Sequence, residues 1–403
     1  MADTARPEIL CIGFGALGAI YSYLLSQGGA GITAVARSNY DLLTTTGVDI
    51  ESVKYGSIRG WKPDRCVRES EPESARDRRF DYVVCTFKNV PDHRSASEII
   101  RRFLQPAARE GQAAKTLPTI VLLQNGVGIE EEVSRKLVEE EKVAKGVISA
   151  VAWIGANLVD GGKKVMHGGL ERLEMGVYPA FGRATASDAE QAALNEFAHI
   201  YKSGGGGGKV VDDIEAIRWQ KVLWNASWGG LSTLARQPVS ALLTEDTLHY
   251  SVGVVRRIML EIVYVARACG LTEQRFPMSS VDQALDITLS TSPVPAVHDP
   301  ARGGNLAAVF KPSILLDLEN GRPMELEPII GNIVSKARLH GVDTPRLDLI
   351  LAALKPNQVA AVERANGGGA HTESVVKFSD LKATSKGNWP EGAPVSRSPN
   401  TYV

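Results

Sequence analysis

The chain has 403 residues, of which 44% are hydrophobic and 23% charged, a composition typical of a globular protein long enough for two domains. The formal net charge of −1 excludes a global positive field that would attract nucleic acid or an acidic membrane surface. The polar residues 1–8 do not form a signal peptide, and no run of about 18 apolar residues predicts a transmembrane helix.

The four cysteines, Cys11, Cys66, Cys85 and Cys269, lie far apart in the sequence and form no CxxC pair or zinc-like spacing. This distribution is typical of reduced thiols in a cytoplasmic protein, and it predicts no metal site.

The first part of the chain alternates between short apolar runs and helical patterns. Residues 9–12, 32–36, 82–86 and 120–123 are predicted strands, and 16–27 is a predicted helix. Residues 147–156, 164–168 and 172–176 are predicted to extend the sheet. Such alternation favours a parallel sheet covered by helices on both faces, so we expect a Rossmann-like α/β domain.

A glycine motif follows the first predicted strand and opens the first predicted helix. The run Gly13, Phe14, Gly15, Ala16, Leu17 and Gly18 is a G-x-G-x-x-G, which in this context predicts a dinucleotide site at the helix N-terminus. These six residues are therefore our candidate cofactor contacts.

Two basic residues follow predicted strands at the edge where such sheets bind ligands. An NAD-binding domain usually carries an acidic residue after its second strand, whereas this chain has Arg37, which would attract the 2′-phosphate of NADP. Lys88 follows the strand 82–86 and is a second candidate for cofactor binding. The alternative for both is an ordinary solvated side chain.

Long polar stretches at 52–79 and 101–118 are expected to be surface elaborations, and the five glycines 204–208 a surface loop. From Asp212 onward the pattern is helical, and Asp212 with Glu215 forms a plausible capping box. Further helices are predicted at 250–269, 306–319 and about 324–340. After Pro356 the composition of Gly, Ser, Asn and Pro predicts a disordered tail.

We therefore divide the chain into four parts. They are an N-terminal segment at 1–8, an NADP-binding Rossmann-like domain at 9–209, a mostly α-helical substrate and catalytic domain at 210–355, and the tail at 356–403.

The helix that begins after Asp212 carries two polar residues among apolar ones. Three- and four-residue steps place Lys221 and Asn225 on one predicted face with Ile214, Ile217, Trp224 and Trp228. Burying an ammonium group lowers its pKa unless it is paired, so Lys221 is a candidate proton donor. The alternative is a lysine at the edge of the face whose amine reaches solvent.

Four ordered motifs resemble the ketopantoate reductase family, over roughly residues 8 to 355. They are the run 218–226 (RWQKVLWNA), the run 123–128 (LQNGVG), the run 312–325 (PSILLDLENGRPME) and the run 167–169 (HGG). His167 itself is expected to be structural rather than catalytic.

The resemblance implies NADP(H) as cofactor and reduction of a small 2-oxo acid, as in the conversion of 2-dehydropantoate to pantoate. It also implies that Lys221 protonates the carbonyl oxygen and that Glu325 orients lysine, substrate or ribose. Asn125 would contact cofactor and substrate, Asn225 and Ser313 would hold the substrate, and the backbone of Ala156 would contact the cofactor. A homodimer is compatible with this interpretation.

The chain departs from the family pattern at Gly229, Val239, Met324 and Ile330, where family members usually carry polar groups or, at Met324, threonine. Such changes alter which substrate is favoured. Two alternatives stay open: a ketone or imine reductase of specialised metabolism with a larger, more apolar substrate, and a non-catalytic NADP(H) sensor. The joint presence of Lys221, Asn225 and Glu325 argues against the sensor.

Overall fold

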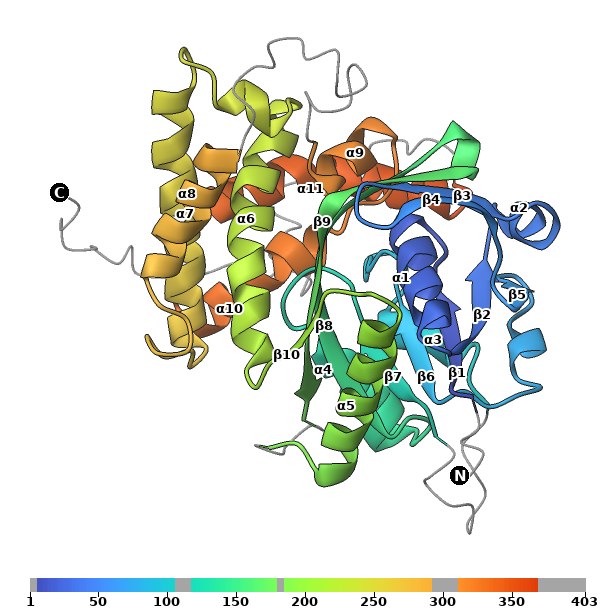
Figure 1. Ribbon diagram of the computed structural model, residues 1–403. Coiled ribbons are helices and arrows are strands. Elements are labelled where there is room, and N and C mark those ends of the chain that lie inside the picture. The colour runs from blue at the N-terminus through green and yellow to red at the C-terminus, as the bar shows by residue number, and fades with distance from the viewer. Residues whose placement is uncertain (1–5, 106–116, 180–184, 292–310, 369–403) are drawn as a thin grey trace.

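The structure is a computed structural model that describes residues 6–105, 117–179, 185–291 and 311–368 (Figure 1). The first half of the chain folds around one large sheet, and the second half forms a group of helices that lies beside it. This is the predicted arrangement of an α/β domain followed by a helical domain.

The sheet has ten strands, of which nine follow the order β4-β3-β9-β8-β7-β6-β1-β2-β5, while β10 pairs with β9. The pairings of β8 with β9 and of β3 with β4 are antiparallel, and the others are parallel. The bounds are β1 Glu8–Ile12, β2 Gly31–Ala36, β3 Val48–Ser52, β4 Gly56–Trp61, β5 Arg65–Arg68, β6 Tyr82–Cys85, β7 Thr119–Leu122, β8 Gly146–Val159, β9 Lys164–Tyr178 and β10 Gly208–Val210.

Five α-helices accompany the sheet: α1 Ala16–Gln27, α2 Tyr40–Thr45, α3 Ala96–Arg101, α4 Ile129–Val133 and α5 Asp188–Ser203. The helical half contains α6 Ile214–Ala235, α7 Leu248–Ala268, α8 Ser279–Thr291, α9 Ser313–Glu319, α10 Asn332–His340 and α11 Pro345–Ala365. Shorter helical turns are η1 Pro72–Ala75, η3 Ser134–Glu140, η4 Asp160–Gly162, η5 Val239–Leu242 and η7 Glu327–Gly331.

The central strands are buried on both faces, which explains why their sequences are continuous apolar runs. In β1, Ile9 packs into the core under α1 and α5, whereas Leu10 and Ile12 pack into the core under α3 and α4. A third core unites the helices of the second half around α6 and α7. Helix α6 packs against both α7 and the strands β8 and β9, so it forms the junction between the two halves.

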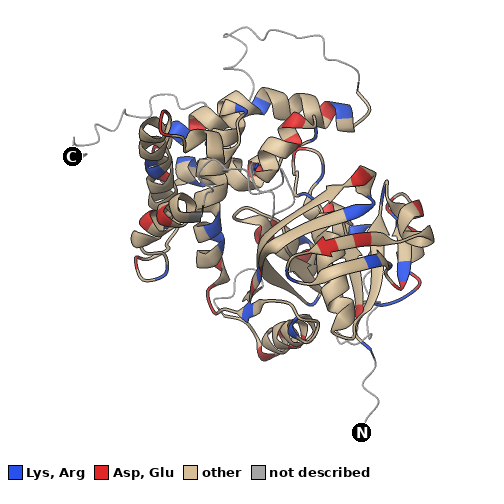
Figure 2. Cartoon of the chain, turned by 45° about the horizontal axis from the view of Figure 1, so that its top comes forward, with Lys and Arg blue, Asp and Glu red and all other residues tan. Residues whose placement is uncertain are grey.

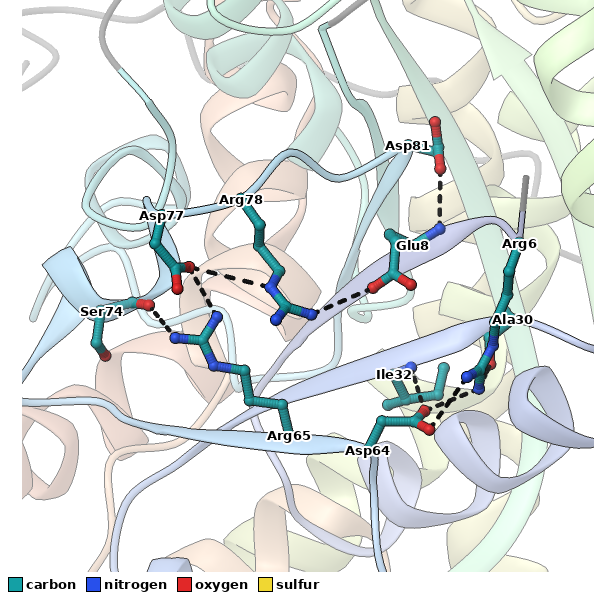
Figure 3. A network of polar contacts seen from close by, with 10 residues as sticks. All are labelled: Arg6, Glu8, Ala30, Ile32, Asp64, Arg65, Ser74, Asp77, Arg78 and Asp81. Atoms are coloured by element: carbon teal, nitrogen blue, oxygen red, sulfur yellow. Dashed lines mark hydrogen bonds and ion pairs between the residues drawn. The ribbon is translucent and has the colours of Figure 1, made fainter.

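The amino ends of the parallel strands are tied together by charged side chains (Figure 3). The carboxylate of Asp64 accepts hydrogen bonds from the Ile32 amide at 2.8 Å and from Arg6 at 2.9 Å, and Asp81 accepts one from the Glu8 amide at 2.8 Å. This network lies at the amino ends of the strands. Ligands of open α/β sheets bind at the opposite edge, which the carboxyl ends of the strands form.

The structure corrects the prediction of a tail from Pro356 onward, because α11 runs through this proline to Ala365. Gln358 on α11 is buried and exchanges hydrogen bonds with the backbone of Met324 at 2.8 and 3.1 Å. The helical domain thus extends past residue 355, and residues 369–403 of the predicted tail lie outside the described residues.

Several predicted boundaries were also wrong. The glycine run is not only a loop, because Gly208 begins β10. The stretch 52–79, expected to be a surface elaboration, contains the elements β4, β5 and η1, for which no strand or helix was predicted. The strands predicted at 164–168 and 172–176 form one continuous strand, β9. The cap of α6 is Asp213, which accepts from the Ala216 amide, rather than Asp212. The helix predicted at about 324–340 is present, because the π-helical segment η7 continues directly into α10. The predicted stretches 101–118 and 306–319 lie partly outside the described residues.

Lys and Arg are interspersed with Asp and Glu over both halves of the molecule in the view of Figure 2, in keeping with the small net charge. Cys11, Cys66, Cys85 and Cys269 are free thiols, as the sequence predicts. Within the described ranges, no helix is long and apolar enough to cross a membrane.

Candidate active site

The glycine motif forms the turn between β1 and α1 and has the geometry of a dinucleotide-binding loop. Gly13 has a φ of 95°, and a Cβ atom there would lie 2.4 Å from the Phe87 amide nitrogen. A Cβ at Gly18 would lie 2.2 Å from the Gly13 carbonyl oxygen, so only glycine allows helix and turn to pack this closely. At Gly15 no atom lies within 4 Å of such a Cβ, which leaves space for a ligand.

The N-terminus of α1 suits the pyrophosphate of a dinucleotide. Its cap, Gly15, supplies no side-chain hydrogen bond, and the first turn contains no acidic residue. The first N–H groups of the helix and their partial positive charge can therefore serve an anion. The other loop residues Phe14, Ala16 and Leu17 support this turn; Phe14 is buried and its ring stacks on Trp61 at a centroid distance of 6.0 Å.

Arg37 directly follows β2 and is exposed. Its guanidinium makes no hydrogen bond or ion pair with any side chain or backbone group in the part of the chain that the structure describes. A cation without a partner at this edge suits a phosphate group on the adenosine ribose.

Helix α6 crosses the face of β8, and a buried arginine anchors the crossing. The Arg218 guanidinium pairs with Glu130, donates to the Ser149 hydroxyl at 2.6 Å, and donates to the carbonyl oxygens of Gln124 at 2.8 Å and Gly126 at 3.2 Å. Arg218 thereby fixes the loop that carries Asn125 against the helix that carries Lys221.

A small pocket opens at this crossing. Its lining comprises Gln124, Asn125, Gly126, Val151, Arg218, Lys221, Val222 and Asn225. Lys221, Asn125 and Asn225 thus lie in one pocket.

Lys221 is largely removed from solvent, and its Nζ donates a hydrogen bond to the Ala152 carbonyl oxygen. Burial, together with the positive charge of Arg218, lowers its pKa from 10.5 to about 8, although Glu325 opposes this shift. A lysine with this pKa is protonated near neutral pH and releases a proton far more readily than a solvated lysine does.

Glu325 connects the two halves of the molecule behind the pocket. Its carboxylate accepts a hydrogen bond from the backbone N–H of Asn89 at 3.1 Å and one from the side-chain amide of Asn125 at 3.0 Å. Glu325 is only 2% exposed to solvent. Asn125 in turn accepts from Asn225 at 3.5 Å. Glu325 therefore orients Asn125 and lies close enough to Lys221 to influence its pKa.

Lys88 is not an isolated surface lysine, because it reaches across to the helical half. Its Nζ lies 2.8 Å from Asp317 and 3.5 Å from Glu325. Burial acts to lower the pKa of Lys88, but the two carboxylates outweigh it and raise this pKa above its ordinary value. For Asp317, burial raises the pKa of the carboxyl group, and the positive charge of Lys88 only partly opposes this shift.

Two of the predicted contacts stand apart from the pocket. Ser313 is exposed at the first position of α9, and Ala156 lies farther along β8, where it packs against the core under α1 and α5. The predicted face of α6 also requires correction, since Trp224 points to α8 and donates to Thr288 at 3.1 Å, and Trp228 is buried in the helical core.

Sequence reasoning missed Arg218, although it stands three residues before Lys221 and seven before Asn225, a spacing that places all three on one side of a helix. It also missed Asp317 and Trp153, which only the fold brings next to Lys88 and Lys221. The predicted structural role of His167 agrees with the structure, in which it is buried, contacts Ser52 at 2.7 Å and lies within reach of the Leu170 carbonyl oxygen. Among the described residues, no group of three His, Cys, Asp or Glu side chains could hold a metal ion.

Comparison with known proteins gives concordant matches over most of the chain. Residues 9–180 match the family model Ketopantoate reductase PanE/ApbA, and residues 213–358 match the model of its C-terminal domain. A relative in Saccharomyces cerevisiae, uncharacterized protein YDL144C, is 29% identical over 387 residues, which cover 94% of this chain and 98% of the relative.

Solved structures agree with these matches. A 2-dehydropantoate 2-reductase from Methylococcus capsulatus is 28% identical, with a TM-score of 0.66 and coverage of 90% of this chain and 100% of that chain. A D-mandelate dehydrogenase in complex with NADH and anilino(oxo)acetate has a TM-score of 0.67 over 88% of this chain and 99% of that chain. Its identity is 18%, so it shows similarity of fold alone.

Proposed function

The chain belongs to the ketopantoate reductase family, and we propose that it uses NADPH to reduce the carbonyl group of a 2-oxo acid, with Lys221 as proton donor. Family membership makes it an oxidoreductase that acts on a CH–OH or C=O group. The observation that carries the proposal is Lys221 itself, a lysine with a pKa of about 8 in a pocket lined by two asparagines.

The chemistry follows from these positions. When bound, the reduced nicotinamide supplies a hydride to the carbonyl carbon. Negative charge develops on the carbonyl oxygen, which Lys221 stabilises and then protonates. Asn125 and Asn225 offer amide groups to the carboxylate of the substrate, and Glu325 holds Asn125 in place through its 3.0 Å contact. The neutral amine left on Lys221 regains a proton from solvent.

We propose that the cofactor is NADP(H) rather than NAD(H). The three glycines of the loop and the N-terminus of α1 fit the pyrophosphate of either dinucleotide. The exposed Arg37, at a position where an acidic residue would serve NAD, favours the 2′-phosphate. Lys88 stands at the carboxyl end of β6, within the same cofactor-binding edge of the sheet.

The finer assignment, reduction of 2-dehydropantoate in pantothenate biosynthesis, is the family's activity and one of two candidates for this chain. Of the positions that depart from the family pattern, Val239 and Met324 are buried in the helical core, so they concern packing. Gly229 lies one turn after Asn225 beside Pro312 and Ile314, and it provides no amide for a hydroxyl group of the substrate. This last difference favours the second candidate, a ketone with a more apolar side chain.

The experiment is a substrate panel. The purified protein is mixed with NADPH and a series of 2-oxo acids, and consumption of NADPH is followed by absorbance. Turnover of any 2-oxo acid supports the reductase and excludes the non-catalytic sensor. Tight binding of NADPH without turnover of any panel member would contradict the proposal.

The free thiols of Cys11, Cys66, Cys85 and Cys269 support a further proposal, that the protein works in the reducing cytoplasm. Assembly as a homodimer stays a prediction, which sedimentation of the purified chain would test.

A further inference from the structure

An aromatic side chain outside the four motif runs stands next to the proposed proton donor. The ring centroid of Trp153 lies 5.8 Å from Lys221 Nζ, and Trp153 is half-buried on β8. It shares a strand face with Ser149, which contacts Arg218, and with Val151, which lines the pocket. The same face of β8 thus passes from the anchor of α6, through the pocket, to this ring.

The ring is held in one orientation by β9. Its indole Nε1 donates to the Glu174 carboxylate at 2.8 Å, and Glu174 is 6% exposed. Arg172 is the direct cross-strand partner of Trp153, and its guanidinium carbon lies 5.3 Å from the ring centroid. The Nη2 atom of Arg172 lies 3.6 Å from the Glu174 carboxylate. An indole fixed at its N–H and beside its ring is a rigid wall.

The surface that this wall offers is apolar. The indole N–H is the only hydrogen-bonding group of tryptophan, and Glu174 already accepts it. A substrate that meets the ring of Trp153 therefore finds carbon atoms and no free donor on the indole itself. A hydroxyl group placed there would lose its hydrogen bonds to water without replacement, whereas an apolar group would gain contact area.

Lys221 consequently stands between two unlike surfaces, the ring of Trp153 and the side of the pocket that carries the asparagines. An oxygen hydrogen-bonded to Nζ lies about 2.8 Å from it, so a substituent on the carbonyl carbon reaches contact distance of a ring centred 5.8 Å from the same nitrogen. On the other surface, Asn125 and Asn225 present amides. A 2-oxo acid also has two unlike substituents, a carboxylate and a side chain, which match the amide surface and the ring respectively.

We propose that Trp153 is a specificity-determining residue and that the substrate is a 2-oxo acid whose side chain is aromatic or bulky and apolar, packed against the indole ring. This inference rests on the proposed reductase function and names the substrate class for it. It places phenylglyoxylate above ketopantoate, whose side chain carries a hydroxyl group.

The test compares kcat/KM with NADPH for phenylglyoxylate, ketopantoate and pyruvate in the wild type. We expect phenylglyoxylate to exceed ketopantoate by about tenfold or more. Trp153→Ala should lower kcat/KM for phenylglyoxylate by about 10- to 100-fold and for the small pyruvate by less than about threefold, since pyruvate has little to pack on the ring. Trp153→Phe keeps an aromatic wall and should stay within about threefold of the wild type.

Tyr264→Ala, at an exposed aromatic on α7, is the matched control and should leave all three values unchanged. Three results would overturn the inference: a wild-type preference for ketopantoate, an equal loss of kcat/KM for all substrates in Trp153→Ala, or a higher dissociation constant for NADPH in that variant. The wild-type preference decides the matter even if Trp153→Ala does not fold. Absence of turnover with every 2-oxo acid refutes the proposed function and this inference together, whereas turnover in the wrong order refutes the inference alone.

Discussion

Replacing Lys221 by methionine separates its chemical role from its structural one, because methionine keeps the length of the side chain and removes the amine. If Lys221 is the proton donor, turnover should fall by about 10²- to 10⁴-fold, the usual contribution of a positioned acid. Binding of NADPH should persist, since the glycine loop at the N-terminus of α1 and Arg37 directly after β2 belong to the α/β half of the molecule and not to α6.

The same substitution should raise the stability of the fold while it lowers turnover. The fall of the Lys221 pKa from 10.5 to about 8 corresponds to about 3 kcal/mol by which the fold disfavours the charged amine, an upper estimate because the side chain is not fully enclosed. This cost is present below pH 8 and disappears as pH rises from 8 to 10.5, where the unfolded chain also loses the proton. Lys221→Met should therefore be more stable than the wild type at pH 7, by up to about 3 kcal/mol. At pH 10 this difference in the free energy of unfolding should be smaller.

Two assays follow these quantities. Steady-state consumption of NADPH gives turnover, and in the wild type turnover should fall as pH rises through about 8, because the acid form of Lys221 is lost. Denaturant unfolding at pH 7 and pH 10 gives the stability difference. Lys202→Ala, at an exposed lysine on α5, is the control and should change neither.

The reasoning is refuted if folded Lys221→Met retains turnover within about tenfold of the wild type, since that would correspond to only about 1.4 kcal/mol of the barrier. It is equally refuted if wild-type turnover is flat between pH 7 and pH 9.5 while substrate is saturating.

Three further predictions concern other parts of the molecule. Arg37→Ala should weaken NADPH by about tenfold or more, through loss of about 1.5–3 kcal/mol of charge-assisted hydrogen bonding, and leave NADH unchanged; equal wild-type dissociation constants for the two cofactors would contradict this. In Glu325→Gln, the new side-chain NH₂ group faces either the Asn89 backbone N–H or the Asn125 side-chain N–H, and one hydrogen bond is lost. The free energy of unfolding should therefore fall by about 1–3 kcal/mol, and turnover should drop. Unchanged kinetics would show that Glu325 has no role in the site. Deleting residues 369–403 should preserve the thermal midpoint and the NADPH affinity, whereas deleting 356–403 removes the buried Gln358 and should lower the midpoint; a large loss in the shorter deletion would show that the segment docks on the domains.

Local features of the chain were readable from the sequence because their causes are local. Gly13 and Gly18 are required by a turn that only glycine allows, and the apolar run before them is a strand buried on both faces. The spacing of Lys221 and Asn225 follows from the helical repeat, which places residues four apart on one side. These features were enough to predict the α/β domain, the helical domain and the centre of the pocket.

Helix and strand boundaries depended on contacts that are distant in sequence. Pro356 removes a backbone donor and normally disfavours a helix interior by about 3 kcal/mol. Yet α11 continues, because Leu354, Gln358 and Val362 remain buried against the helical domain. In the same way, Gly208 enters a strand because β9 offers it a partner.

The sequence by itself determined which residue types were available for chemistry, and the tertiary structure decided which of them meet. Lys88 reaches Asp317 and Glu325 across more than 200 positions, and Arg218 binds carbonyl groups about 90 positions earlier in the chain. Trp153 lies beside Lys221 only because β8 directs alternate side chains toward α6. No periodicity encodes such neighbours, because they depend on how strands and helices pack, and the pKa of about 8 at Lys221 is a product of that packing.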